Sequence, residues 1–183
     1  MRRLSLALVV ALALVAGCSM GAPSAPTPPT TPEVPASQPL PTPSADDVAG
    51  QEALAAYRGM WADFVAAGTT SDWQSPDLGR HTTGVALTNL SRGLYADSAN
   101  GLVTRGEPVL SPEVSSVEPT GAPVRVVVTD CGDSTNSLKY RLSDGTLVNE
   151  GAGGRRLINA VVERQSDGSW KVSDFGVQEI GSC

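Results

Sequence analysis

The feature that most constrains the fold of this chain is a change in hydrophobic periodicity near Asn100-Gly101. Before this point apolar residues recur every three or four positions, over residues 53–65 and again over 84–97. After it, short apolar runs are separated by glycine and proline turns. The first pattern is typical of amphipathic helices and the second of strands. Helices followed by an antiparallel sheet predict the α+β class.

Two helices and a short helical turn are expected in the first part. Ser44 stands three residues before Asp47, a spacing typical of a capping box with Asp in place of Glu. The helix that follows should end near Gly68. A helical turn is expected over 77–81. In the second helix, 84–97, the residues expected to face inward are Val85, Leu87, Leu90 and Leu94.

The strands of the second part are read from β-branched runs and turn residues. Residues 102–105 and 114–117 are short candidates, and residues 124–129 are the clearest strand. Two hairpins are expected, each with an Asp-Gly turn. They pair residues 138–142 with 146–148, and residues 155–164 with 170–179.

The N-terminal residues 1–17 read as an export leader. Arg2 and Arg3 precede 13 mostly apolar residues, which are too few to span a membrane. Cys18 follows the small residues that close this run, and the segment resembles the lipobox of bacterial lipoproteins. The resemblance implies that Cys18 receives a diacylglycerol, that cleavage occurs before it, and that the protein is anchored on the extracytoplasmic face of the cell membrane. The alternative is an ordinary secretory signal that contains a cysteine.

Residues 18–47 form a segment of a different composition. It holds nine of the 14 prolines, many Ser and Thr residues and few charges. Because such a segment cannot build an apolar core, we expect a disordered tether between the anchor and a folded domain. The domain is expected to cover residues 48–183.

The chain has three cysteines, an odd number for an exported protein. Assigning Cys18 to the lipid leaves Cys131 and Cys183. A zinc site would need further ligands, and the only histidine is His81. We therefore expect a disulfide between Cys131 and Cys183, as is usual in an oxidising compartment, and no metal site.

The net negative charge of the chain indicates which classes of molecule it binds. The chain has 13 basic and 19 acidic residues, and loss of Arg2 and Arg3 with the leader makes it more acidic. An acidic surface repels phosphate backbones, so nucleic acid is not an expected partner.

The domain also resembles a known fold family. An opening helix with the segment 56–61, a helical pair and a meander closing on 167–172 are similar to the NTF2-like (SnoaL/ketosteroid-isomerase-like) cone. The segments 106–112, 128–131 and 153–156 resemble uncharacterised secreted lipoproteins of high-GC Gram-positive bacteria. The resemblance implies N-terminal helices packed on a curved antiparallel sheet. It transfers no activity, because the superfamily includes enzymes, ligand binders and catalytically silent domains.

Few residues are candidates for chemistry. His81 is the first candidate for a general base, with Asp77 as the acid beside it, but we expect a surface position. Asp130 and Asp133 flank Cys131 and are candidates to mimic the carboxylate base of the isomerase-like enzymes, but we expect a solvated turn there. The run 151–156 has the glycines and two arginines of an anion site, but lacks the strand-then-helix context of a P-loop, so we expect a flexible turn.

Three aromatic residues of the first helix are candidates for a pocket. Tyr57, Trp61 and Phe64 share one helix face, which in the NTF2-like fold packs over the concave sheet; the alternative is a purely structural core. We expect a non-catalytic module, without cofactor or metal, that binds a small apolar ligand or another envelope protein. The alternative is a small pocket enzyme of isomerase or hydratase type.

Overall fold

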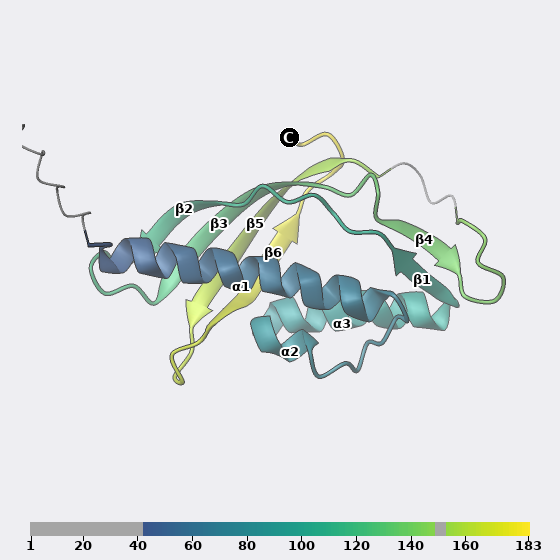
Figure 1. Cartoon of the computed structure of the whole chain (residues 1–183), viewed down its shortest axis with the longest axis horizontal. Helices are drawn as coiled ribbons and strands as arrows, with labels where there is room; N and C mark the ends of the chain where they lie inside the picture. Colours follow the sequence, from purple (N-terminus) through teal and green to yellow (C-terminus); the bar gives the residue numbers. More distant parts are fainter. Residues whose placement is uncertain (1–41, 149–152) are drawn as a thin grey trace, which may run out of the picture. The chain divides into compact units, whose positions relative to one another are not determined.

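Figure 1 shows helices that precede strands in the computed structural model, which describes residues 42–148 and 153–183. The helices are α1 (Ala45–Gly68), α2 (Leu78–His81) and α3 (Gly84–Ala99). The strands are β1 (Leu102–Arg105), β2 (Glu113–Glu118), β3 (Arg125–Asp133), β4 (Leu138–Arg141), β5 (Arg155–Arg164) and β6 (Trp170–Val177). This order confirms the predicted α+β class. The predicted leader, the lipidated Cys18 and the tether as far as residue 41 lie outside the described residues.

Helix α1 begins with the predicted capping box. The Ser44 hydroxyl accepts a hydrogen bond from the Asp47 amide at 3.1 Å, and the Asp47 carboxylate accepts one from the Ser44 amide at 3.1 Å. The bonds from Ser44 lower the pKa of Asp47. Because α1 already starts at Ala45, residues 45–47 are helical, although the sequence analysis assigned them to the tether.

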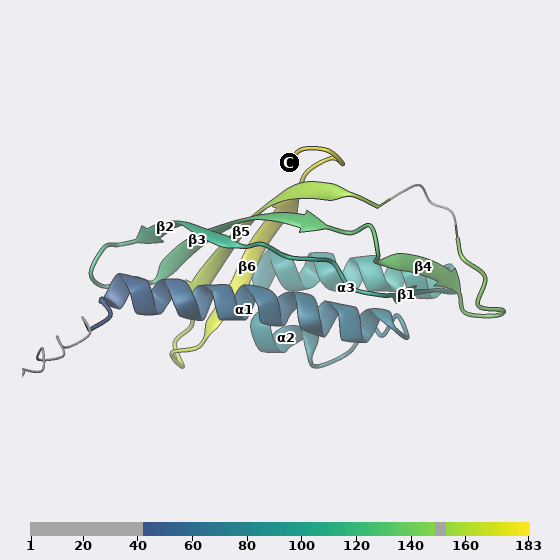
Figure 2. The same cartoon turned by 45° about the horizontal axis from the view of Figure 1, so that its top comes forward.

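The main sheet has the strand order β2-β3-β5-β6, and every neighbouring pair is antiparallel. Helices α1 and α3 lie on the same side of this sheet, called here the inner face (Figures 1 and 2). Successive side chains of a strand alternate between the two faces. The core on the inner face is built from buried residues of these strands and of α1: Val126, Val128, Ile158, Ala160, Val162, Tyr57 and Met60.

Strand β4 has the partner that the sequence predicts over a short stretch, and a second partner that the sequence does not predict. It pairs with β1 in a separate two-stranded sheet, with Val103 opposite Tyr140. The expected strand 146–148 contributes an isolated bridge, between Tyr140 and Leu147. The turn before it is held by Asp144, whose carboxylate accepts hydrogen bonds from the Thr146 amide and hydroxyl. The Arg141 amide donates to the Thr146 carbonyl and the Val148 amide to the Lys139 carbonyl, each at 2.9 Å, so the predicted hairpin is present but short, whereas β1 pairs along all of β4.

At the start of α3 the buried residue is Ala86, where the prediction has Val85. Ala86, Leu90 and Leu94 are buried at intervals of four residues, whereas Val85 is 53% exposed. Strand β3 is also longer than expected, since it continues through Asp133. The terminal hairpin of β5 and β6 agrees with the prediction, apart from an earlier end at Val177.

A disulfide joins Cys131 to Cys183, with the two Cα atoms 5.9 Å apart, as the sequence predicts. Cys131 lies within β3, opposite Leu157 of β5. The tail that leads to Cys183 follows β5. The Gln178 amide donates to the Leu157 carbonyl at 2.9 Å, and the Gly181 amide to the Arg155 carbonyl at 2.8 Å. The disulfide therefore fixes the chain terminus to the middle of the sheet.

Candidate ligand-binding site

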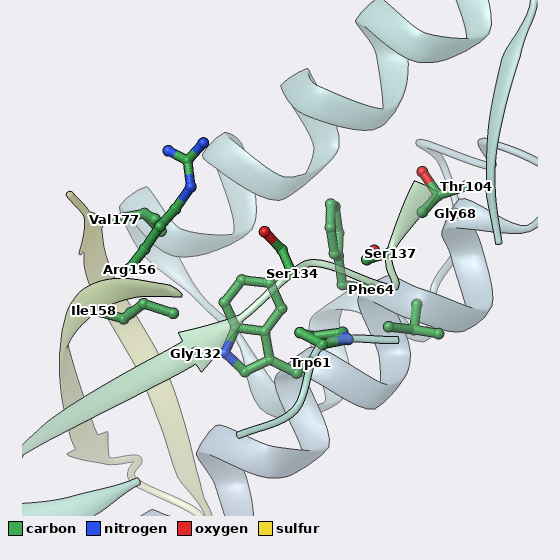
Figure 3. Close-up of a pocket in the computed structure, with 12 residues that line it drawn as sticks. Trp61, Phe64, Gly68, Thr104, Gly132, Ser134, Ser137, Arg156, Ile158 and Val177 are labelled. Carbon is green, nitrogen blue, oxygen red and sulfur yellow. The ribbon is translucent and has the colours of Figure 1, made fainter. Parts of the chain in front are cut away.

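A cavity of about 190 Å³ lies between the second half of α1 and the ends of β3, β5 and β6 (Figure 3). Its wall is mostly apolar. The apolar side chains that line it are Trp61, Phe64, Val65, Pro108, Ile158 and Val177. An engineered apolar cavity of about 150 Å³ holds one benzene molecule. The cavity is therefore large enough for an aromatic ring or a short alkyl group.

The helical wall of the cavity follows from the periodicity of α1. Trp61, Phe64 and Gly68 are three and four residues apart and so share one face of the helix. The Trp61 and Phe64 rings meet edge to face, with centroids 5.9 Å apart. Trp61 meets Phe175 of β6 in the same way at 6.1 Å. These contacts fix the indole that forms one side of the cavity.

The sheet wall follows from the register of β3 and β5. Gly132 is opposite Arg156, and Asp130 is opposite Ile158. A methyl group at Gly132 would be 2.9 Å from the Ile158 Cδ1 atom, closer than ordinary van der Waals contact. Glycine at this position keeps the space in front of the sheet open. A glycine inside a strand is a sequence signal that a ligand or another part of the chain approaches the backbone closely. The sequence predictions above do not include this signal.

The structure separates the three aromatic residues that the sequence grouped as possible pocket lining. Trp61 and Phe64 line the cavity, but Tyr57 does not. Tyr57 is fully buried one turn earlier, and its hydroxyl donates to the Asp130 carboxylate at 2.9 Å. Its role is therefore in the core, and the pocket-lining prediction is wrong for this residue.

Asp130 is buried, which contradicts the predicted solvated turn. Its carboxylate is 1% exposed and accepts hydrogen bonds from the Tyr57 hydroxyl and from the Ser111 amide at 2.6 Å. Burial, and then the negative charge of Asp130, raise the pKa of Tyr57 well above its ordinary value. Tyr57 thus remains a neutral donor. Because β3 continues beyond Asp130, the strand alternation turns this carboxylate to the inner face.

Asp133 and the glycine-rich run behave differently from Asp130. Asp133 accepts hydrogen bonds from the Thr135 amide at 2.9 Å and hydroxyl at 2.6 Å, which lower its pKa. Asp133 is the last residue of β3, and its carboxylate holds the turn that follows, so the predicted turn begins after this residue. Of the run 151–156, residues 151 and 152 lie outside the described residues. Arg155 and Arg156 begin β5, and Arg156 lines the cavity.

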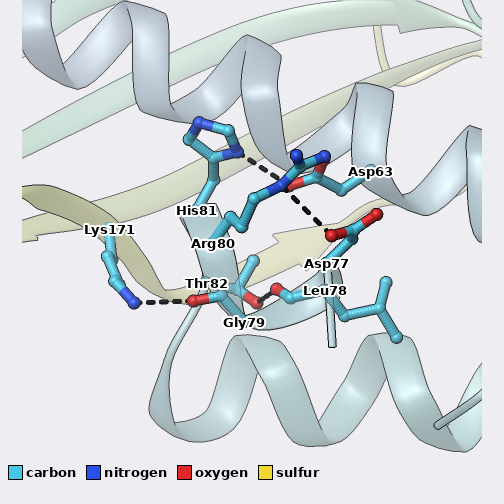
Figure 4. Close-up of polar contacts among 8 residues, drawn as sticks. All are labelled: Asp63, Asp77, Leu78, Gly79, Arg80, His81, Thr82 and Lys171. Atoms are coloured by element: carbon cyan, nitrogen blue, oxygen red, sulfur yellow. Dashed lines mark hydrogen bonds and ion pairs between the residues drawn. The ribbon is translucent and has the colours of Figure 1, made fainter. Parts of the chain in front are cut away.

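His81 holds α2 against α1 (Figure 4). Its Nδ1 atom is 2.7 Å from the Oδ2 atom of Asp63, a buried carboxylate that also accepts from Arg80 at 2.5 Å. The predicted neighbour Asp77 instead lies 3.6 Å from Arg80. The His81 side chain is 38% exposed, so its position at the surface agrees with the expectation, although its ring also bonds the buried Asp63. Its ring packs on Gly59, where a methyl group would be 2.6 Å away.

Most of the residues that line the cavity from the second half of the chain are not predicted by the sequence. The polar lining residues are Thr104, Ser134, Ser137 and Arg156. They come from β1, from the segment after β3 and from β5, and only the tertiary arrangement brings them together. Neither Asp130 nor His81 is among the lining residues of this cavity.

Two further observations apply to residues 42–148 and 153–183. No helix there is both long enough and apolar enough to cross a membrane. No group of three or more His, Cys, Asp and Glu side chains there is arranged to hold a metal ion.

Comparison with known proteins gives distant structural similarities. No family model matches the chain, and no curated protein matches it. A ketosteroid isomerase-like protein from Erwinia carotovora atroseptica SCRI1043 aligns with a TM-score of 0.41 and 12% identity, over 69% of this chain and 92% of that one.

Two other solved structures align in a similar way. The intermembrane space region of the chloroplast protein ARC6 has a TM-score of 0.37 and 15% identity, over 65% of this chain and 95% of that one. A protein from Catenulispora acidiphila has a TM-score of 0.39 and 18% identity, over 70% and 92%. These similarities are too distant to assign a function.

Proposed function

We propose that this protein is a lipid-anchored extracytoplasmic lipoprotein whose NTF2-like domain binds a small apolar ligand. The observation that carries the proposal is the apolar cavity between α1 and the sheet. A domain that acted only through its outer surface would have no need for an open space inside. Binding sites for small molecules are concave and mostly apolar, with a few polar groups. The cavity has this composition.

The site favours binding over catalysis. A general base must lie within hydrogen-bond reach of the proton that it removes. The buried carboxylate of Asp130 does not line the cavity, and each of its oxygen atoms already accepts a hydrogen bond. The His81–Asp63 pair lies at the contact of α1 with α2, and neither residue lines the cavity. Within residues 42–148 and 153–183, the polar side chains that do line it include no carboxylate and no imidazole.

Ligand binding can be tested with 3-phenylpropan-1-ol, a neutral probe with one ring. The chain has three tryptophans, so the indole N–H signals of the ¹⁵N-labelled protein report separately on the cavity and on remote positions. We expect the probe to shift the Trp61 signal in a saturable way. The signals of Trp73 and Trp170 should change little, because neither residue lines the cavity.

A filled cavity should abolish this response. At Gly68 a methyl group would make an ordinary contact of 3.5 Å with Thr104, so the remaining atoms of a Gly68→Leu side chain would enter the cavity. The control is Gly93→Leu on α3, where a methyl group meets nothing within 4 Å. Loss of binding in Gly68→Leu alone supports the proposal. Equal shifts in all three proteins would contradict it.

The anchor is the second part of the proposal, and its support is the sequence around Cys18. Two or three acyl chains give stable membrane attachment. We expect the wild-type protein to enter the detergent phase, with an intact mass that includes the lipid, and Cys18→Ala to remain unmodified. Cys183→Ser is the control for loss of a cysteine and should still partition with detergent. An unmodified wild-type protein would disprove the anchor.

A further inference from the structure

Among the residues that the structure describes, Arg156 is the one charged residue that lines the cavity. The pleat of β5 explains its position. Arg156 and Ile158 are two residues apart, so both point to the inner face, whereas Arg155 points to the outer face with Leu157. The Nε atom of Arg155 accordingly lies 3.2 Å from the Cys131 sulfur of the disulfide. The side chains of these two adjacent arginines thus lie on opposite faces of the sheet.

Few groups of the described residues balance the positive charge of the Arg156 guanidinium. Its Nη1 atom donates to the Gln178 carbonyl at 3.2 Å. Among the described residues no carboxylate forms an ion pair with it. In Figure 3 its side chain extends away from the Trp61 indole, so that the ring-lined and the charged parts of the cavity are separate. Gly132, its cross-strand partner, has no side chain that would cover it.

We infer that the ligand of this cavity is a small amphipathic carboxylic acid, with its apolar group against Trp61 and Phe64 and its carboxylate on Arg156. This inference rests on the proposed ligand-binding function. A planar guanidinium matches a carboxylate with two parallel hydrogen bonds, and the ionised pair forms stronger bonds than neutral groups do. The cavity volume limits the apolar group to about one ring.

The test compares 3-phenylpropionate with 3-phenylpropan-1-ol, which have the same ring and chain, on the purified protein. Dissociation constants come from the Trp61 indole signal. A hydrogen bond to a charged group contributes about 1.5–3 kcal/mol, so we expect the acid to bind at least about tenfold more tightly than the alcohol. Arg156→Gln should weaken binding of the acid more than binding of the alcohol and so abolish this preference. Arg156→Lys, which keeps the charge, should retain part of it.

Arg155→Gln is the matched control, because it removes the same charge one residue away on the outer face. Retention of the preference in Arg155→Gln and its loss in Arg156→Gln support the inference. Equal binding of acid and alcohol to the wild type would overturn it and leave the proposed function intact. Equal losses in both variants would also overturn it, since the effect would then come from net charge. Binding of neither probe would overturn the inference and the proposed function together.

Discussion

Replacing Cys183 with serine should lower the free energy of unfolding by about 4 kcal/mol, because the loop closed by this disulfide is long. The two cysteines are 52 residues apart. Cross-linking them restricts the unfolded chain, and this restriction is lost in the variant. The fold itself should persist, since the helices and the main sheet form their core without the sulfur atoms. Denaturant unfolding monitored by circular dichroism measures the change.

The control for this prediction is the double variant Cys131→Ser with Cys183→Ser, which removes both thiols. It should match the single variant and the reduced wild-type protein. Amide exchange should increase first at Gln178 and Gly181, whose backbone bonds hold the tail to β5. A loss below about 1 kcal/mol would mean that the unfolded chain is already restricted without the bond.

Tyr57→Phe should lower the free energy of unfolding by about 2–3 kcal/mol, because it leaves a buried carboxylate with one donor fewer. Asp130 is 1% exposed and receives hydrogen bonds only from Tyr57 and Ser111 among the described residues. The ring is retained, so packing changes little. A double-mutant cycle with Asp130→Asn separates the energy of the pair from the effect of each substitution. Independent, additive losses would show that the hydroxyl does not stabilise the carboxylate.

The same pair predicts a pH dependence. The pKa of Tyr57 is raised in the folded protein, by burial and then by the charge of Asp130. Its contribution to stability is therefore complete below the unfolded pKa of about 10 and is lost as the pH rises above it. Wild type should lose more stability between about pH 9.5 and 11 than Tyr57→Phe does. Equal slopes in this range would contradict the raised pKa.

The elements that could be predicted are those whose signals are local. The capping box at Ser44 and Asp47 is complete within four residues, and α1 begins where that signal predicts. The last hairpin has the turn Asp167-Gly168 between two long β-branched runs, and it forms as expected. The local hairpin of β4 with residues 146–148 was also predictable, but its pairing with β1 was not, because β1 is more than thirty residues away in sequence.

The candidate site was predictable only in part for the same reason. Helical spacing identified Trp61 and Phe64, but it could not show that Tyr57, one turn earlier, meets a carboxylate of β3. The expected strand 124–129 ends before Asp130 and so leaves this residue in a turn, whereas β3 continues through Asp133. The lining role of Arg156 depends on the register of β5 against β3, which no local pattern specifies.

That register has a consequence for how the chain reaches the correct structure. Cys131 and Gly132 are neighbours in β3, opposite Leu157 and Arg156 of β5. A slip of the β3–β5 pairing by one residue would exchange the faces of every side chain in the slipped strand. The sulfur of Cys131 would then turn toward the helices, out of reach of Cys183 on the outer face. The disulfide is therefore compatible with the orientation of β3 that also turns Gly132 toward the cavity, and incompatible with the slipped one.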